Sequence, residues 1–429
     1  MESLQSKQGF VKLCFYFILM VMAAYCVYSI AAASRQMYWD FPNYYVSARL
    51  ISEGEPVQQF YDNDWFEARG HDMGIDRTAR FNPFPPITSL VMLPLSGLEP
   101  MAAKRVWIGI NVLLLIATIA LWRKAFRLEW ASSAFLILLT GLALGMNFRL
   151  GQIYLLVLFL LLVVYLAFQK SRLNLSASVL AVIASLKYFP VVFIAGFFKK
   201  GYLFRFSVAI VLLLGLQWLI FGIEGFEAYV QVLLNHLNGN IDGQGQHLVQ
   251  FQSFDSFFSN VFLTDPDTGA QALINWPAGK TVGKVLTLLL TGASAAYVFK
   301  KVNSSSVEGK GDYYLAIAGF ASYVVLPATA SYHMILLLFP LGVLIKREMG
   351  QSSFGQLVLL LLLFGIACNS GALGFTNSRF EGIGLVLNYP RLWAVVLLYI
   401  VAMRMILQAV ARPTQANALS NDFRSLWRL

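Results

Sequence analysis

Asp40 lies in the segment Met37–Tyr45, where a very apolar chain becomes aromatic and polar just after an apolar run over about residues 10 to 33. A carboxylate at a membrane surface can act as a general base that takes the proton from an attacking hydroxyl group. Asp40 could equally cap a helix expected over Phe41–Leu50, because Asp is favoured at that position and Pro42 suits a first helical turn. One residue can perform both roles.

Three cationic or ionisable residues are candidates to face an anionic group near this carboxylate. Lys187 lies within an apolar stretch, where an unpaired ammonium costs about 2.5 kcal/mol or more on insertion scales. Arg149 precedes Gly151-Gln152, and His333 ends a Ser-Tyr-His turn. Each also has a purely structural interpretation: Lys187 can snorkel or pair with a carboxylate, Arg149 can anchor a helix at the headgroups, and His333 can be an interfacial residue.

The composition of the chain defines the elements that must position these residues. Of 429 residues, 58% are hydrophobic and 13% are charged, with a mean hydropathy of +0.64. Apolar runs of about 18 residues recur, which is typical of an all-α polytopic membrane protein. We expect a single integral membrane domain over residues 1–429 with about twelve crossings, near residues 10–33, 101–122, 129–147, 153–168, 174–187, 189–198, 203–222, 281–299, 313–330, 333–345, 353–374 and 390–410.

Two of these ranges, 174–187 and 189–198, are short and meet at Lys187-Tyr-Phe-Pro190. They are predicted to form either two short spans or a broken, re-entrant pair. The first range is longer than the apolar core of a signal peptide, which favours an uncleaved span.

The distribution of basic residues predicts the orientation. The net charge is +10, and Lys and Arg cluster in alternate connections, which is the pattern of cytoplasmic loops rather than of a nucleic-acid surface. Both termini, including a tail over 411–429, are therefore expected in the cytoplasm, and no nucleic-acid partner is expected. Two long polar loops, 34–100 and 223–279, are expected outside, so any chemistry would be extracytoplasmic.

The first outer loop is predicted to carry interfacial helices. One is an amphipathic surface helix over Phe41–Leu50, and another is the apolar piece Ile87–Leu98, which is too short and too close to prolines for a span. The second outer loop is rich in Asn, Gln, Gly and aromatic residues, a composition that suits hydroxyl-rich ligands or a simple solvated linker.

Motifs for soluble cofactors are absent from the sequence. It contains no Walker A sequence, no GxGxxG after a strand, no HExxH and no CxxC, so we expect no cofactor. The acidic residues of the first outer loop are irregularly spaced, as on a solvated face, and we expect no metal site; they are Asp62, Asp64, Glu67, Asp72 and Asp76.

An ordered series of short motifs resembles a known family. The chain is similar to the GT-C glycosyltransferases, and most closely to the polyprenol-phosphate-mannose-dependent α-mannosyltransferases, glycosyltransferase family 87. The similarity extends over about residues 37 to 340. The motifs are Asp40 with Tyr44 and Tyr45, Tyr61-Asp62, Asn82-Pro-Phe-Pro-Pro86, Gly151-Gln152, Leu186-Lys187-Tyr-Phe-Pro190 and Ser331-Tyr-His333.

The resemblance implies transfer of a sugar, mannose or another hexose, from a polyprenyl-phosphate donor to a lipid-linked or glycan acceptor, with inversion at the anomeric carbon. Asp40 would be the catalytic base. Residues that would bind the donor phosphate or the substrates are Lys187, His333, Arg149, Gln152, Tyr44, Tyr45 and Asn82. Membrane lipids would surround the protein.

Two other functions remain open from the sequence. A secondary transporter also has about twelve spans, broken helices and an intramembrane lysine. The long first outer loop and the lack of two matching halves argue against it. A non-catalytic assembly partner that retains the fold is the third possibility.

Overall fold

The computed structural model describes residues 2–237, 246–266, 269–348, 354–373 and 382–411, and within these ranges the chain is helical without strands. The long helices are α1 (Glu2–Ala33), α5 (Pro100–Phe126), α10 (Tyr202–Leu237), α12 (Ala278–Ser304) and α16 (Pro390–Ala411). Shorter bundle helices are α6 (Trp130–Leu138), α7 (Leu142–Leu150), α8 (Tyr154–Gln169), α9 (Leu173–Leu186), α13 (Lys310–Val325), α14 (Leu338–Glu348) and α15 (Phe354–Asn369), with 3₁₀ helices η4 (Phe189–Gly196), η6 (Ser331–Leu337) and η7 (Ser370–Leu373).

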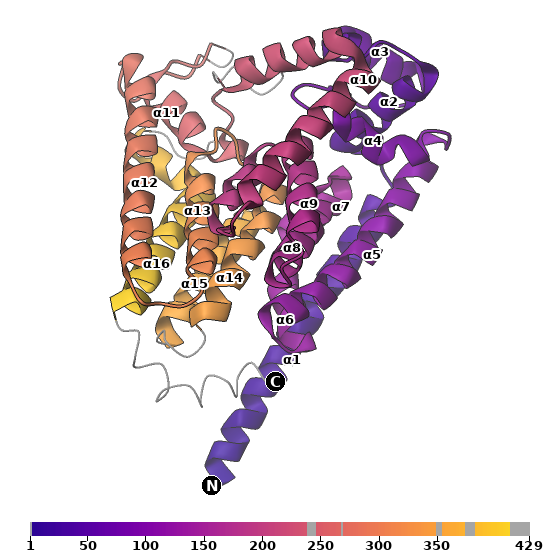
Figure 1. Cartoon of the computed structure of the whole chain (residues 1–429). Helices are drawn as coiled ribbons and strands as arrows, with labels where there is room; N and C mark the ends of the chain where they lie inside the picture. Colours follow the sequence, from indigo (N-terminus) through magenta and orange to yellow (C-terminus); the bar gives the residue numbers. More distant parts are fainter. Residues whose placement is uncertain (1, 238–245, 267–268, 349–353, 374–381, 412–429) are drawn as a thin grey trace.

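The remaining elements belong to the connections predicted to be extracytoplasmic or to the approach to α16. They are α2 (Asp40–Glu53), η1 (Val57–Tyr61), α3 (Asn63–Asp72), η2 (Pro86–Thr88), α4 (Ser89–Met92), η3 (Leu93–Leu95), η5 (Val249–Phe251), α11 (Phe254–Phe262) and η8 (Gly382–Asn388). In Figure 1, α2, α3, α4 and α11 lie at one end of the helical bundle, opposite the N-terminus.

The predicted spans coincide with helical structure, but their lengths differ. Five helices (α1, α5, α10, α12 and α16) are long and apolar enough to cross a membrane. A sixth is obtained if α6 and α7, which are bent by 70° at a break, form one span. These helices are those of an integral membrane protein. The other predicted ranges hold shorter helices, so the count of twelve crossings stays a prediction.

The short pair that meets at Lys187 forms an antiparallel hairpin. The Lys187 ammonium lies near Tyr154 at the beginning of α8, whereas the Lys199 ammonium donates to the carbonyl of Phe168 at the end of α8. The chain therefore returns along η4 over the whole length of α8. The range 189–198 forms this 3₁₀ helix rather than an α-helical span.

The first outer connection is packed more deeply than the sequence predicts. Helix α2 forms over the predicted Phe41–Leu50, but nine of its fourteen residues are buried, so the expectation of a surface helix was wrong. The piece predicted as interfacial folds into η2, α4 and η3, and α2 packs on α4 and η3. The helix is buried because its aromatic side chains pack inward on several sides; Phe41, Tyr44 and Tyr45 are each at most 2% exposed.

The element α10 consists of two helical parts that meet at Gly222, whose φ of 73° and ψ of 168° are not helical. The first part ends where the predicted span 203–222 ends, and a second helix, to Leu237, occupies the beginning of the predicted second outer loop. In Figure 1 the second half of α10 crosses above the bundle from the α3 side toward α11, and α10 packs on η1 and η2. Most of the polar stretch Asn235–His247 and nearly all of the tail 411–429 lie outside the described residues.

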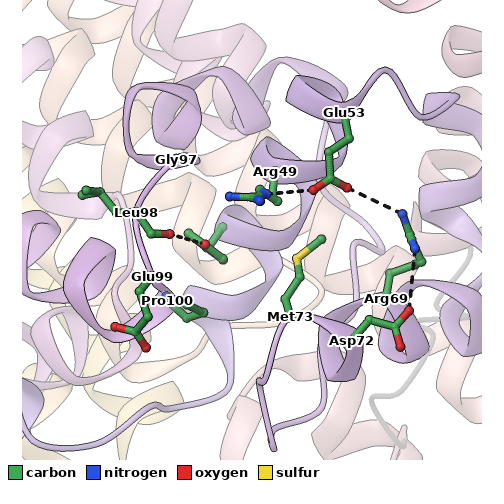
Figure 2. Close-up of a pocket in the computed structure, with 10 residues that line it drawn as sticks. Arg49, Glu53, Arg69, Asp72, Met73, Gly97, Leu98, Glu99 and Pro100 are labelled. Atoms are coloured by element: carbon green, nitrogen blue, oxygen red, sulfur yellow. Dashed lines mark hydrogen bonds and ion pairs between the residues drawn. The ribbon is translucent and has the colours of Figure 1, made fainter.

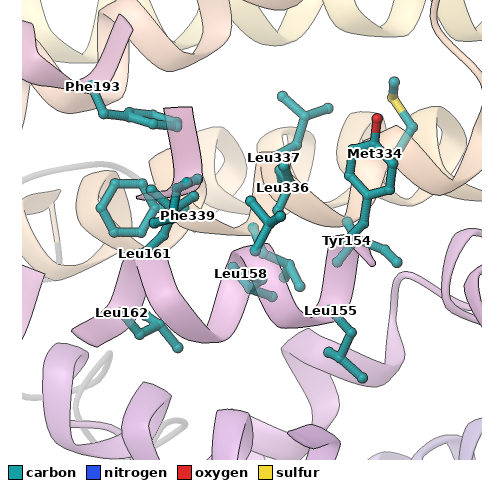
Figure 3. Packing of buried hydrophobic residues seen from close by; sticks show 14 of the residues in the cluster. Tyr154, Leu155, Leu158, Leu161, Leu162, Phe193, Met334, Leu336, Leu337 and Phe339 are labelled. Atoms are coloured by element: carbon teal, nitrogen blue, oxygen red, sulfur yellow. The ribbon is translucent and has the colours of Figure 1, made fainter. Parts of the chain in front are cut away.

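The apolar core fixes the beginning of α8 against η6, the segment that carries His333. Figure 3 shows Tyr154, Leu155, Leu158 and Leu161 of α8 packed against the residues after His333, which include Met334 and Leu336. These side chains are fully or almost fully buried. Dense packing of this kind leaves little freedom to the polar residues at its outer end.

We predict that Gly151→Ala destabilises the protein by about 2 kcal/mol or more, because the position combines a left-handed backbone with a close contact. Gly151 has φ of 68°, and an added Cβ would lie 2.7 Å from the Cβ of Phe41. The measurement is the thermal unfolding midpoint of the purified protein in detergent. Gly215→Ala in α10 is the control, because nothing lies within 4 Å of its added Cβ; equal midpoints for the two variants would contradict the contact argument.

Candidate active site

The position of Asp40 is determined where α2 meets the end of α7. Gly151 ends α7 and lies against Phe41, the residue after Asp40. The buried ammonium of Lys104 donates to the carbonyls of Gln36 and Arg149, which lie just before α2 and in the last turn of α7. The chain is therefore held on both sides of Asp40 by contacts to the same helix end.

The Asp40 carboxylate is held by hydrogen bonds. The Gln152 side-chain amide donates from Nε2 to Oδ2 of Asp40 at 2.7 Å, and the hydroxyl of Tyr332 also donates to this carboxylate. The Tyr44 hydroxyl donates to Oε1 of Gln152 at 2.8 Å. Gln152 and Tyr44 are 1% and 0% exposed, so this chain of hydrogen bonds lies inside the protein.

Asp40 lies in the first outer connection, outside the membrane-spanning helices. Burial raises the pKa of the Asp40 carboxyl above its usual value, and the hydrogen bond from Gln152, the charge of Lys187 and the hydrogen bond from Tyr332 partly offset this rise. A carboxylate with a raised pKa is a stronger base than an exposed one. The alternative role of Asp40 as a helix cap is not seen. The N-cap residue of α2 is Trp39, Asp40 is the first residue of the helix, and no side chain makes a capping hydrogen bond.

Lys187 comes from the turn between α9 and η4 and lies among aromatic rings. Its Nζ is 4.4 Å from the ring centroid of Phe84, 5.4 Å from that of Tyr154 and 5.9 Å from that of Tyr44. The faces of aromatic rings attract a cation. The charge of Lys187 also acts on Asp40, so two residues that the sequence suggested separately lie near each other in the structure.

His333 lies beside the same aromatic rings, at the beginning of η6. Its Nδ1 accepts a hydrogen bond from the backbone N–H of Ala330 at 3.1 Å. In the neutral imidazole the proton is therefore on Nε2, which makes that nitrogen a hydrogen-bond donor. The ring centroid lies 4.8 Å from that of Tyr154 and 4.7 Å from that of Tyr332.

A cavity of about 110 Å³ joins these groups. Gln152, Lys187, Tyr332 and His333 contribute its polar side chains, and Tyr188 belongs to both the cavity and the exposed surface. Its other walls are the Pro83–Pro85 turn and apolar residues from three further segments, Leu186, Phe189, Phe251, Leu326 and Ala328. The carboxylate of Asp40, bonded to Gln152 and Tyr332 of the wall, can accept a proton. The ammonium of Lys187, on another part of the wall, can bind an anionic group of a ligand.

Four predicted substrate-binding residues do not line this cavity: Tyr44 is buried behind Gln152, and the other three face elsewhere. Tyr45 points to the other face of α2, where its hydroxyl donates to the carbonyl of Leu98 at 2.6 Å. Asn82 donates to the carbonyl of Tyr61 at 3.2 Å within the first outer connection, so it orders that turn. Arg149 does not line the cavity, and its carbonyl accepts from Lys104.

A larger pocket of about 490 Å³ lies on the side of α2 that Tyr45 faces (Figure 2). Its charged residues pair with one another: Arg49 contacts Glu53 at 2.8 Å, and Arg69 contacts Glu53 and Asp72 at 3.6 Å each. Such half-exposed pairs contribute little individually. Since no carboxylate here is buried against a single cation, the smaller cavity is the better candidate for chemistry.

The sequence prediction did not assign roles to Tyr332, Tyr154 and Phe84, although each contacts Asp40 or Lys187. Tyr332 and Phe84 lie inside quoted motifs, next to His333 and Asn82. Their roles depend on which side chain of each motif points inward, and this could not be read from motifs without a regular helical or strand period.

One family of known proteins matches this chain. The sequence model of glycosyltransferase family 87 matches residues 82–327, which is more than half of the chain. No curated protein is significantly similar in sequence. Among solved structures, the crystal structure of ArnT from Cupriavidus metallidurans in the apo state aligns with a TM-score of 0.38 and 13% identity, over 95% of this chain and 78% of that chain. That similarity is too weak to support a statement about the fold or activity of this protein, and the GT-C arrangement stays a prediction.

We predict that Lys187→Met raises the pKa of Asp40 further, because the charge of Lys187 lowers the pKa of this carboxyl. The measurement is the pH dependence of Asp40 modification by dicyclohexylcarbodiimide, which reacts with protonated carboxyl groups, followed by mass spectrometry. The midpoint should move to higher pH. Lys199→Met, which removes an ammonium at the other end of α8, should leave it unchanged; an unmoved midpoint in Lys187→Met would contradict the pairing.

Proposed function

Since the chain belongs to glycosyltransferase family 87, we propose that it transfers a sugar from a polyprenyl-phosphate donor to a hydroxyl group of a lipid-linked or glycan acceptor, with Asp40 as the general base. The observation that carries this proposal is that the half-buried carboxylate of Asp40 is hydrogen-bonded to Gln152 and Tyr332, which line one cavity together with the ammonium of Lys187. Membership of a glycosyltransferase family favours transfer over the transport alternative.

The reaction is a single displacement. The acceptor oxygen attacks the anomeric carbon, the bond from that carbon to the phosphate oxygen breaks, and the hydroxyl proton passes to Asp40. One displacement inverts the anomeric configuration. Asp40 suits this role because its raised pKa makes it a better proton acceptor, and because hydrogen bonds from Gln152 and Tyr332 fix its orientation.

The leaving group is a polyprenyl phosphate, which gains negative charge as the bond breaks. A cation or donor placed beside it stabilises the transition state more than the ground state. Lys187 provides the cation, and the Nε2–H of His333 provides a donor on the same cavity. The ring cage of Phe84, Tyr154 and Tyr44 keeps water from screening the ammonium.

The cavity volume sets a condition on substrate binding. At about 110 Å³ it is smaller than the roughly 300 Å³ or more of typical small-molecule sites. A sugar phosphate therefore requires part of the wall to move.

We propose that the donor is a hexosyl phosphate lipid, and mannose is the sugar implied by the family resemblance. We further propose that the transfer occurs on the extracytoplasmic side of a bacterial inner membrane, without a cofactor or metal.

We predict that Asp40→Asn lowers the rate of transfer by about 100-fold or more, because the amide cannot accept the hydroxyl proton. The measurement is transfer of radiolabelled sugar from defined polyprenyl-phosphate hexoses by the purified protein in lipid, with membrane lipids and glycans as acceptors. Asp76→Asn, an exposed carboxylate of the same outer connection, is the matched control. Wild-type turnover in Asp40→Asn, with unchanged unfolding temperature, would exclude Asp40 as the base.

We predict that Lys187→Met raises the KM for the lipid donor and lowers kcat, by about 10-fold each, because the phosphate loses its cation in both the ground state and the transition state. Initial rates at varied donor concentration measure both constants. The KM for the acceptor should stay within about twofold. A variant with unchanged donor KM and kcat would show that Lys187 does not contact the phosphate.

A further inference from the structure

Gln152 lies between two residues of the same helix. Its Nε2 donates to Asp40 at 2.7 Å and its Oε1 accepts from the Tyr44 hydroxyl at 2.8 Å. Asp40 and Tyr44 are four residues apart, so they lie one above the other on one face of α2. The side chain of Gln152 thus bridges one turn of α2, from Asp40 to Tyr44.

This bridge has a defined direction because the two ends of a carboxamide differ. The NH₂ end can only donate and the C=O end can only accept. With its oxygen occupied by the Tyr44 hydroxyl, Gln152 presents N–H to Asp40, and this arrangement is compatible with an ionised carboxylate. In the opposite orientation, the Gln152 oxygen would face Asp40 and would favour the protonated acid, which cannot accept a proton from a substrate.

Other groups also face Asp40 and must be included in any account of its titration. Lys187 approaches from the end of α9 and stabilises the carboxylate by its charge, and Tyr332 donates to it from η6. His333, next to Tyr332, and Tyr154 of α8 stack on the same ring cluster. Among the described residues, only Gln152 connects the carboxylate to a second residue of α2 through side-chain hydrogen bonds at both ends.

We propose that Gln152 and Tyr44 are positioning residues that hold Asp40 in the orientation and proton-accepting form required for catalysis, and that they are not contacts to the sugar donor. This inference rests on the proposed function, because it assigns a task to residues that the family resemblance associates with substrate. Gln152 reaches the cavity wall, but its amide groups are directed to Asp40 and Tyr44, and Tyr44 is completely buried.

The test compares Tyr44→Phe with Tyr45→Phe. Both variants remove one buried hydroxyl from adjacent positions of α2: that of Tyr44 bonds Gln152, whereas that of Tyr45 bonds the carbonyl of Leu98 on the opposite face. In Tyr44→Phe we expect the acidic limb of the pH profile of kcat to move up by about half a pH unit, the value of one hydrogen bond. The donor KM should stay within twofold, and Tyr45→Phe should show neither change.

A second variant extends the series. Gln152→Met retains the length and apolar volume of the side chain but removes the donor, so the acidic limb should move further than in Tyr44→Phe, again without a change in donor KM. A raised donor KM with an unmoved pH profile in both variants would overturn the proposal and assign these residues to substrate binding. Equal shifts of the acidic limb in Tyr44→Phe and Tyr45→Phe would show that the effect comes from general destabilisation of α2. That result would also overturn the proposal.

Modification of Asp40 by dicyclohexylcarbodiimide separates this inference from the proposed function, because it reports protonation without turnover. If the midpoint rises in Tyr44→Phe and Gln152→Met but no donor supports transfer, the hydrogen-bonded bridge is correct and the proposed reaction is wrong. If transfer is observed but neither the labelling midpoint nor the pH profile moves, the reaction is supported and the bridge is rejected.

Discussion

The interaction on which the site depends is the attraction between the carboxylate of Asp40 and the ammonium of Lys187, which are both half-buried. Each charge alone would be costly in an apolar protein, and together they are tolerated only if hydrogen bonds and aromatic rings complete their surroundings. Asp40 receives hydrogen bonds from Gln152 and Tyr332, and Lys187 is enclosed by the rings of Phe84, Tyr154 and Tyr44. The elements that carry these groups must therefore be held firmly in relation to one another.

Much of the fold provides this rigidity. The end of α7 receives Phe41 against Gly151 and a hydrogen bond from Lys104, so α2 begins at a fixed place. The apolar contact between α8 and the chain after His333 fixes the opposite wall (Figure 3). The hairpin of α9 and η4 then carries Lys187 to the space between them. The proposed transfer from a lipid-linked donor needs such a site, where a lipid headgroup and the hydroxyl of an acceptor can meet.

The site residues that the sequence suggested fall into two groups in the structure. Asp40, Lys187, Gln152, Tyr44 and His333 were identified from residue type and motif order, and the structure brings them to one place. Tyr45, Asn82 and Arg149 were identified on the same grounds, yet their side chains order neighbouring turns or face elsewhere. A motif specifies which residues occur together along the chain, whereas the direction of each side chain depends on packing against segments distant in sequence.

By itself the sequence determined that the chain is a helical membrane protein and where its apolar helices lie. It also indicated which acidic and basic residues have a high enough free-energy cost in an apolar environment to suggest a function. Those properties follow from composition and from the local cost of placing charge in an apolar run. Only the tertiary structure decided that α2 is buried rather than on the surface, that a second helix follows the kink at Gly222, and that the Gln152 amide points its N–H toward Asp40 and its oxygen toward Tyr44. These features depend on contacts between segments far apart in the chain, and no local pattern encodes them.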